Sequence, residues 1–242
     1  MYSRLVGSEM CIRDRKNLGS SAAASGGTLQ ESLEEGMVAS AHLSKQFGVD
    51  VKIIGKGLNE MAADMETFGH LGTKEMAAVA TYTAKLGVEM SALKGVMDKF
   101  DSFQGAAEAA GKLNEAFGMN VDTMKMMNAE NPAERMDMLR QSLQETGKSF
   151  DELSRHEKKL MAQTMGMDMK SLQNAMSVDV DDMGFDDFGD AAEEAAEKMT
   201  PEQAMQDVAK SIKKLSHAMT QMSKGPFSEF TRGFMQVIDR SP

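Results

Sequence analysis

Residues 81–121, TYTAKLGVEMSALKGVMDKFDSFQGAAEAAGKLNEAFGMNV, decide the fold because one five-residue pattern occurs near both ends of this stretch. The pattern is an apolar residue, Gly, a second apolar residue, an acidic or amide residue and a third apolar residue. Two further copies lie outside the stretch, and the four glycines are Gly48, Gly87, Gly118 and Gly166. Recurrence of one local pattern indicates that one local structure is used repeatedly along the chain.

Each copy predicts a joint between two helices. A glycine can adopt the left-handed conformation that ends a helix, and the apolar residue after it can fold back onto the last helical turn. The next Asp or Asn can cap a new helix by accepting hydrogen bonds from its first N–H groups, which Glu89 does less well. Because the glycines are unevenly spaced, the sequence predicts recurring joints and not a solenoid of fixed repeat.

Helix signals fill residues 28–177, and no strand pattern competes with them. The sharpest start is Asn131-Pro132, where a capping residue precedes a proline in the first helical position. Gly55-Lys56-Gly57 interrupts another apolar seam, which favours a helix start as late as Leu58. We therefore predict an all-α fold of about eight to ten short helices joined by Gly turns, loosely bundled or extended, without a sheet.

The first residues are interpreted as an artefact. Residues 5–15, LVGSEMCIRDR, can be encoded by DNA that resembles a transposase sequencing adapter read through in frame, so residues 1–15 are excluded from fold reasoning. The alternative is an unstructured native N-terminus. Cys11, the single cysteine, falls inside this segment, and residues 16–27 are predicted to be a disordered linker of small residues. We expect the chain to be a fragment of a longer protein.

The last third of the chain changes in composition. Residues 178–199 are rich in Asp and Glu and are predicted to be an acidic linker or a domain boundary. Thr200-Pro201 then provides a cap and a first-position proline for an amphipathic helix over residues 200–224, and residues 225–242 form a tail.

Composition narrows the classes of function. The formal net charge of −10 argues against an electrostatic nucleic-acid surface or an anionic-membrane surface. No window approaches the 18 or more apolar residues of a membrane-spanning helix. Methionine accounts for 25 of the 242 residues and Trp is absent, so apolar helix faces are expected to pack adaptably. Those faces are either ordinary core or a groove that binds partner helices.

No catalytic or metal-binding pattern is present. The four histidines, His42, His70, His156 and His217, lie far apart, as solvated side chains on helix faces do. Acidic residues from Asp179 onward imitate a calcium loop only in part, because Met183 occupies a ligand position. We predict no catalytic residue, no cofactor, no metal and no enzymatic activity.

The middle of the chain resembles a known family of proteins. Residues 69–121, GHLGTKEMAAVATYTAKLGVEMSALKGVMDKFDSFQGAAEAAGKLNEAFGMNV, and residues 131–168, NPAERMDMLRQSLQETGKSFDELSRHEKKLMAQTMGMD, carry the resemblance. They are similar to phage tail tape measure proteins, especially those of marine phages with contractile tails. The match covers residues 68–177, and its last segment is carried by Phe150, Leu153, Met161, Ala162, Met165 and Gly166.

The resemblance implies a structural protein of the virion. Such a protein lies in the lumen of the tail tube, governs tube length during assembly in the host cytoplasm and leaves during DNA ejection. Its expected partners are further copies of itself, the tail tube protein and baseplate proteins, with no nucleic acid or membrane bound by this segment. The alternative is a helical adaptor domain that binds partner helices through its Met-rich faces.

Overall fold

The computed structural model describes residues 29–129, 131–177 and 184–210, and the regular secondary structure of these residues is entirely helical, without a strand. The helices are α2 (Leu29–Phe47), α3 (Val51–Ala63), α4 (Met65–Phe68), α5 (Thr73–Leu86), α6 (Met90–Phe100), α7 (Phe103–Phe117), α8 (Thr123–Asn128), α9 (Pro132–Glu145), the 3-10 helix η1 (Phe150–Glu152), α10 (Arg155–Met165), α11 (Met169–Ser177) and α12 (Phe185–Lys198). Residues 201–210 are also helical. The all-α prediction is confirmed, with somewhat more helices than the eight to ten expected.

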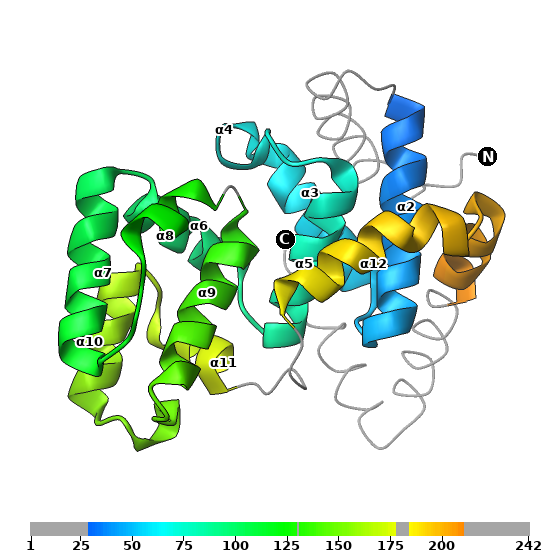
Figure 1. Ribbon diagram of the computed structural model, residues 1–242. Helices are drawn as coiled ribbons and strands as arrows, with labels where there is room; N and C mark the ends of the chain where they lie inside the picture. The colour runs from blue at the N-terminus through cyan, green and yellow to red at the C-terminus, as the bar shows by residue number, and fades with distance from the viewer. Residues whose placement is uncertain (1–28, 130, 178–183, 211–242) are drawn as a thin grey trace, which may run out of the picture.

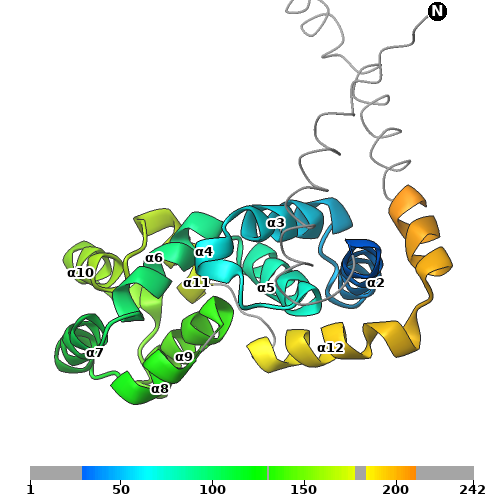
Figure 2. The same ribbon diagram turned by 90° about the horizontal axis from the view of Figure 1, so that it is seen from above.

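The helices form two lobes that share one continuous apolar core (Figure 1). The first lobe contains α2, α3, α5 and α12, and the second contains α6 to α11. Helix α5 is surrounded by α2, α3 and α12 (Figure 2). Ten of its 14 residues are buried. Its charged residues Lys74, Glu75 and Lys85 are partly exposed, so the helix is buried on most of its circumference, as a helix at the centre of a domain is.

Helix α12 corrects the prediction of an acidic linker over residues 178–199. Its carboxylates lie on the exposed face, whereas the opposite face is buried against α2 and α5 and consists of Phe185, Phe188, Ala191, Ala192 and Ala195. The Phe188 ring stacks on Phe47 of α2 with centroids 4.0 Å apart and meets Tyr82 of α5 edge-on at 5.3 Å. Acidic residues at the start of α12 also suit the positive end of the helix dipole. Residues 178–183 lie outside the described residues.

Helix α3 corrects a second expectation, because it begins at Val51 and not at Leu58. Asp50 caps it by accepting a hydrogen bond from the Lys52 backbone N–H at 2.8 Å. Gly57 has a packing role, since a Cβ at this position would lie 2.9 Å from the Cβ of Ala80 in α5. The glycine that weakens α3 locally therefore lets α3 and α5 approach closely.

Two other start signals are confirmed, and the first of these helices ends at a left-handed glycine. Asn131 caps α9 and Pro132 is its first residue, while Gly147 adopts a φ of 70° just after the helix ends. Thr200 and Gln203 exchange hydrogen bonds at the predicted start of the C-terminal helix. The rest of that helix beyond Lys210 lies outside the described residues, as do the predicted artefact, linker and tail at residues 1–15, 16–27 and 225–242.

The second lobe contains a backbone-to-backbone contact between α6 and the joint after α10. A Cβ built on Gly95 would collide with the carbonyl oxygen of Gly166, and a Cβ on Gly166 would collide with the carbonyl oxygen of Gly95. Neither obstacle is the end of a flexible side chain, so neither can yield cheaply. Only a pair of glycines permits this approach.

We expect Gly95→Ala to destabilise the chain by about 1–3 kcal/mol, because the added methyl group would have to displace backbone. Gly111→Ala in α7 is the matched control, since it is also a glycine inside a helix but has open space around it. It should stabilise the chain by about 0.5–1 kcal/mol through helix propensity. Urea unfolding measures both values, and equal stability of the two variants would show that the contact does not constrain the fold.

Candidate functional site

The four predicted joints all adopt the left-handed conformation. The φ angles are 70° at Gly48, 66° at Gly87, 73° at Gly118 and 74° at Gly166. At Gly87 the backbone N–H of Val88 donates to the carbonyl of Thr83 at 3.0 Å, a hydrogen bond that closes the helix end. Met167 and Ala162 form the equivalent bond at 2.9 Å at the last joint. The pattern therefore predicted the backbone geometry correctly.

The side chains that follow each glycine also behave largely as predicted. The apolar residues Val49, Val88, Met119 and Met167 are all buried. Asp168 accepts hydrogen bonds from two backbone N–H groups of α11, whereas Glu89 precedes α6 without any side-chain capping bond. The third joint differs, because α8 is capped by Asp122 and not by Asn120. Asn120 instead donates its backbone N–H to the Ser142 hydroxyl.

Each joint is also held by a group far away in the sequence, which the sequence did not predict. Lys85 donates to the carbonyl of Phe47 at 3.2 Å, and Lys148 donates to the carbonyl of Phe117 at 3.3 Å. Both lysines thus bind the last carbonyl of a helix, where a cation is favoured by the helix dipole. Asn174 donates to the carbonyl of Gly87 at 2.6 Å. The fourth joint is held by the Gly95–Gly166 contact.

A buried polar cluster lies where the two lobes meet. Asp137 of α9 accepts hydrogen bonds from the Tyr82 hydroxyl at 2.9 Å, from Gln141 at 2.9 Å and from the backbone N–H of Phe185 at 3.2 Å. Arg140 lies 3.7 Å from Asp137, and it donates to the Tyr82 hydroxyl at 3.2 Å and to the carbonyl of Ala175 at 2.7 Å. Asp137 and Arg140 of α9 thereby form hydrogen bonds with residues of α5, α11 and α12.

The electrostatics of this cluster fit a structural role. Burial raises the pKa of Tyr82 well above its ordinary range, and the charge of Asp137 raises it further. The hydroxyl therefore remains protonated and donates its hydrogen bond. The sequence carried part of the signal for this cluster. Asp137 and Arg140 stand three residues apart in α9, a spacing at which an acidic and a basic side chain can interact. No neighbouring residue identified Tyr82 as their partner.

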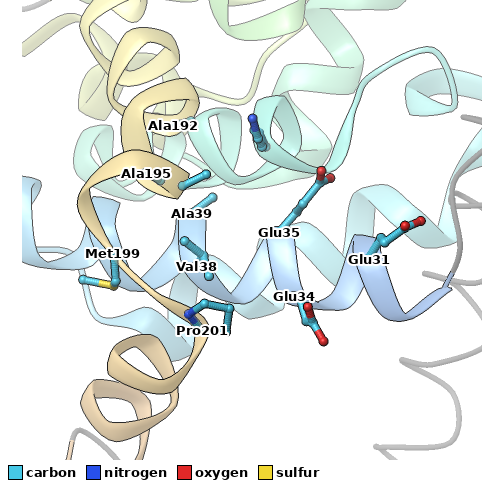
Figure 3. Close-up of a pocket in the computed structure, with 11 residues that line it drawn as sticks. Glu31, Glu34, Glu35, Val38, Ala39, Ala192, Ala195, Met199 and Pro201 are labelled. Carbon is cyan, nitrogen blue, oxygen red and sulfur yellow. The ribbon is translucent and has the colours of Figure 1, made fainter.

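An open groove of about 210 Å³ lies between α2 and α12 (Figure 3). Its floor is apolar, and its rim carries glutamates from α2. The floor residues are Val38, Ala39, Ala192, Ala195, Met199 and Pro201, and the rim residues are Glu31, Glu34, Glu35 and Lys74. Lys74 forms an ion pair with Glu193 at 3.0 Å, so the net charge of the groove is negative.

His42 lies on α2 near the charged end of α12. Its Nε2 atom is buried and finds no hydrogen-bond partner among the described residues. Burial lowers the pKa of His42, and the nearby cations Lys198 and Lys45 lower it further, against the opposing effects of Gln46 and Glu194. The folded chain therefore favours the neutral imidazole.

Of the 19 methionines in the described residues, ten are buried in the core and five more are partly buried against it. Those that are buried are Met61, Met76, Met97, Met119, Met126, Met136, Met161, Met165, Met167 and Met199. Among the described residues, Met124, Met169 and Met205 are exposed, and they come from three different helices. The Met-rich faces therefore mainly fill the interior.

Comparison of the chain with protein-family models, with curated proteins and with solved structures yields no match. Within residues 29–129, 131–177 and 184–210, no three His, Cys, Asp or Glu side chains are grouped so that they could hold a metal ion. In the same residues, no helix combines the length and the apolar character needed to cross a membrane.

We expect Tyr82→Phe to lower the free energy of unfolding by about 1–3 kcal/mol, because Asp137 and Arg140 would each lose a buried partner. The ring and its contacts with Phe185 and Phe188 would remain. Thr81→Val is the matched control in α5, since the Thr81 hydroxyl donates to the carbonyl of Ala77 in its own helix, and the substitution should cost less than about 1 kcal/mol. Similar unfolding curves for the two variants would contradict a special role for the cluster.

We expect His42 to make the chain less stable in mild acid. Its pKa is lower in the folded chain than its ordinary value of 6.5, so the unfolded state binds the proton more readily. The stability that it contributes is present above pH 6.5 and is lost as the pH falls through the folded pKa. The difference in unfolding free energy between pH 7 and pH 5 should shrink in His42→Gln and persist in His156→Gln, which alters an exposed histidine. An unchanged pH dependence in His42→Gln would exclude this assignment.

Proposed function

We propose that this chain is a structural segment of a phage tail tape measure protein. In this role it lies in the lumen of the tail tube, sets the length of the tube during assembly in the host cytoplasm and leaves when DNA is ejected. Its partners are further copies of itself, the tail tube protein and baseplate proteins. The proposal rests on the resemblance over residues 68–177, a range that contains α5 to α11 and three of the four left-handed glycine joints.

The helical architecture supports the proposal through simple geometry. An α-helix rises about 1.5 Å per residue, so a helical chain can measure length in proportion to its number of residues. The described residues fold back at Gly48, Gly87, Gly118 and Gly166, which makes them compact. A bundle with defined joints can become an extended chain by changing the backbone angles of a few glycines, while each helix keeps its own hydrogen bonds.

The groups that hold the joints give this change an energetic basis. Lys85, Lys148 and Asn174 each bind a carbonyl at or beside a joint glycine, so opening a joint breaks one tertiary hydrogen bond. That hydrogen bond contributes about 0.5–1.5 kcal/mol, and opening a joint also exposes apolar side chains of the shared core. The extended form therefore requires the wall of the tube, or neighbouring copies, to cover those side chains, while each helix keeps its own hydrogen bonds.

The helical adaptor remains the alternative function. Its strongest sequence argument is the Met-rich faces, and most methionines of the described residues lie in the core or pack against it. The acidic groove between α2 and α12 is the surface that an adaptor of this kind would use. An adaptor would have no effect on tail length, which separates the two hypotheses.

We expect in-frame removal of residues 68–177 from the phage gene to shorten the tail by about 165 Å, which is the helical length of the 110 residues removed. Duplication of the same residues should lengthen the tail by a similar amount, and it is the matched control because it keeps every native segment. Electron microscopy of purified virions measures both lengths. Tails of unchanged length in both mutants would refute the tape measure assignment.

The genomic setting offers a second test that needs no mutant. Primers inside residues 68–177 can be used to sequence the source DNA outward past both ends. A long helical reading frame among tail tube and baseplate genes supports the proposal. A short gene that is isolated from phage genes contradicts it and favours the adaptor.

A further inference from the structure

Two of the four helix joints contact each other reciprocally. One is the Gly87 joint between α5 and α6, and the other is the Gly166 joint between α10 and α11. Asn174 of α11 donates its side-chain N–H to the carbonyl of Gly87 at 2.6 Å. Gly95 of α6 lies so close to the backbone of Gly166 that neither residue has room for a Cβ. The helix that follows each joint therefore contacts the other joint.

The two contacts also occupy equivalent positions in the two helical hairpins. Residues 87–95, GVEMSALKG, and residues 166–174, GMDMKSLQN, align without a gap from the joint glycine to the contact residue. The apolar residue after each glycine is buried, and so are Leu93 and Leu172 at the seventh aligned position. Both hairpins thus use the same positions for the core and for the contact.

The Gly48 and Gly118 joints are built differently. A Cβ on either glycine would meet nothing within 4 Å in the described part of the chain. A lysine, Lys85 or Lys148, binds the last carbonyl of the helix before each of these joints. A flexible lysine side chain can follow a small movement of the helix, whereas two touching backbone segments cannot.

The reciprocal contacts connect the opening of one joint to the opening of the other. The α10–α11 hairpin contacts both the Gly87 joint and α6, so α6 cannot swing away from α5 while this hairpin keeps both contacts. The α5–α6 hairpin likewise contacts both the Gly166 joint and α11. Opening of either joint therefore breaks a contact that supports the other joint.

We propose that the Gly87 and Gly166 joints form an interlock that opens as one cooperative unit, and that the Gly118 joint opens separately from it. The interlock is a local unit of stability, and its opening is one step and not two. This proposal does not depend on the tape measure assignment, because it uses only contacts within the chain. Tail length in the phage mutants tests that assignment separately.

The test measures hydrogen exchange of single backbone amides in the full chain by NMR. The reporters are the N–H groups of Val88, Met167 and Gly118, each of which donates to a carbonyl of the preceding helix. Asn174→Ala removes the bond to the Gly87 carbonyl. We expect it to speed the exchange of Val88 and Met167 by the same factor, about two- to tenfold, which is the effect of one net hydrogen bond. The exchange of Gly118 should not change.

Lys148→Met is the matched control, because it also removes one hydrogen bond to a carbonyl at a joint. It should speed the exchange of Gly118 and leave Val88 and Met167 unchanged. Gly95→Ala perturbs the interlock from its other side by crowding Gly166. It should speed the exchange of Val88 and Met167 together. Circular dichroism confirms that each variant is folded.

Four outcomes overturn the proposal. A faster exchange that is confined to Val88 in Asn174→Ala shows that the two joints open independently. An equal increase at Val88, Met167 and Gly118 shows that the chain opens only as a whole. Unchanged exchange at all three shows that the bond from Asn174 does not hold the joint closed. Faster exchange of Val88 and Met167 in Lys148→Met shows that the Gly118 joint belongs to the same unit.

Discussion

The buried carboxylate of Asp137 is the point on which the arrangement of the helices depends. It accepts hydrogen bonds from α5, from its own helix α9 and from the first backbone N–H of α12. Arg140 supplies the compensating charge and extends the cluster to α11. A buried charge without partners is costly, so the geometry of these four helices is coupled. The apolar core drives the helices together, whereas this cluster specifies how they meet.

Glycine sets the distances that this arrangement needs. Gly57 lets α3 approach Ala80 of α5, and the Gly95–Gly166 pair brings backbone against backbone in the second lobe. Methionine is abundant in the same core, and its flexible side chain fills the irregular spaces that such close crossings leave. A chain with few aromatic residues can thus build one continuous interior from small and adaptable side chains.

The sequence predicted what is decided locally. A left-handed glycine, a buried residue after it and most of the helix caps depend only on neighbouring residues, and these predictions are confirmed. Helix α12 was missed because its dense acidic residues obscured a buried face made of Phe and the small side chain of Ala. The partners of the joints were missed as well. Lys85, Lys148 and Asn174 reach their carbonyls only after the helices have packed.

The position of α12 also has a consequence for synthesis on the ribosome. Helices α2 and α5 depend on α12 to cover their apolar faces, yet 112 residues separate the end of α5 at Leu86 from the end of α12 at Lys198. At ordinary elongation rates of about 5–20 residues per second, those faces stay uncovered for roughly 6–22 s after α5 has been made. During that interval the nascent chain presents Tyr82 and Phe47 without Phe188, which makes it a candidate for chaperone binding. The first lobe can therefore finish folding only after the ribosome has translated α12.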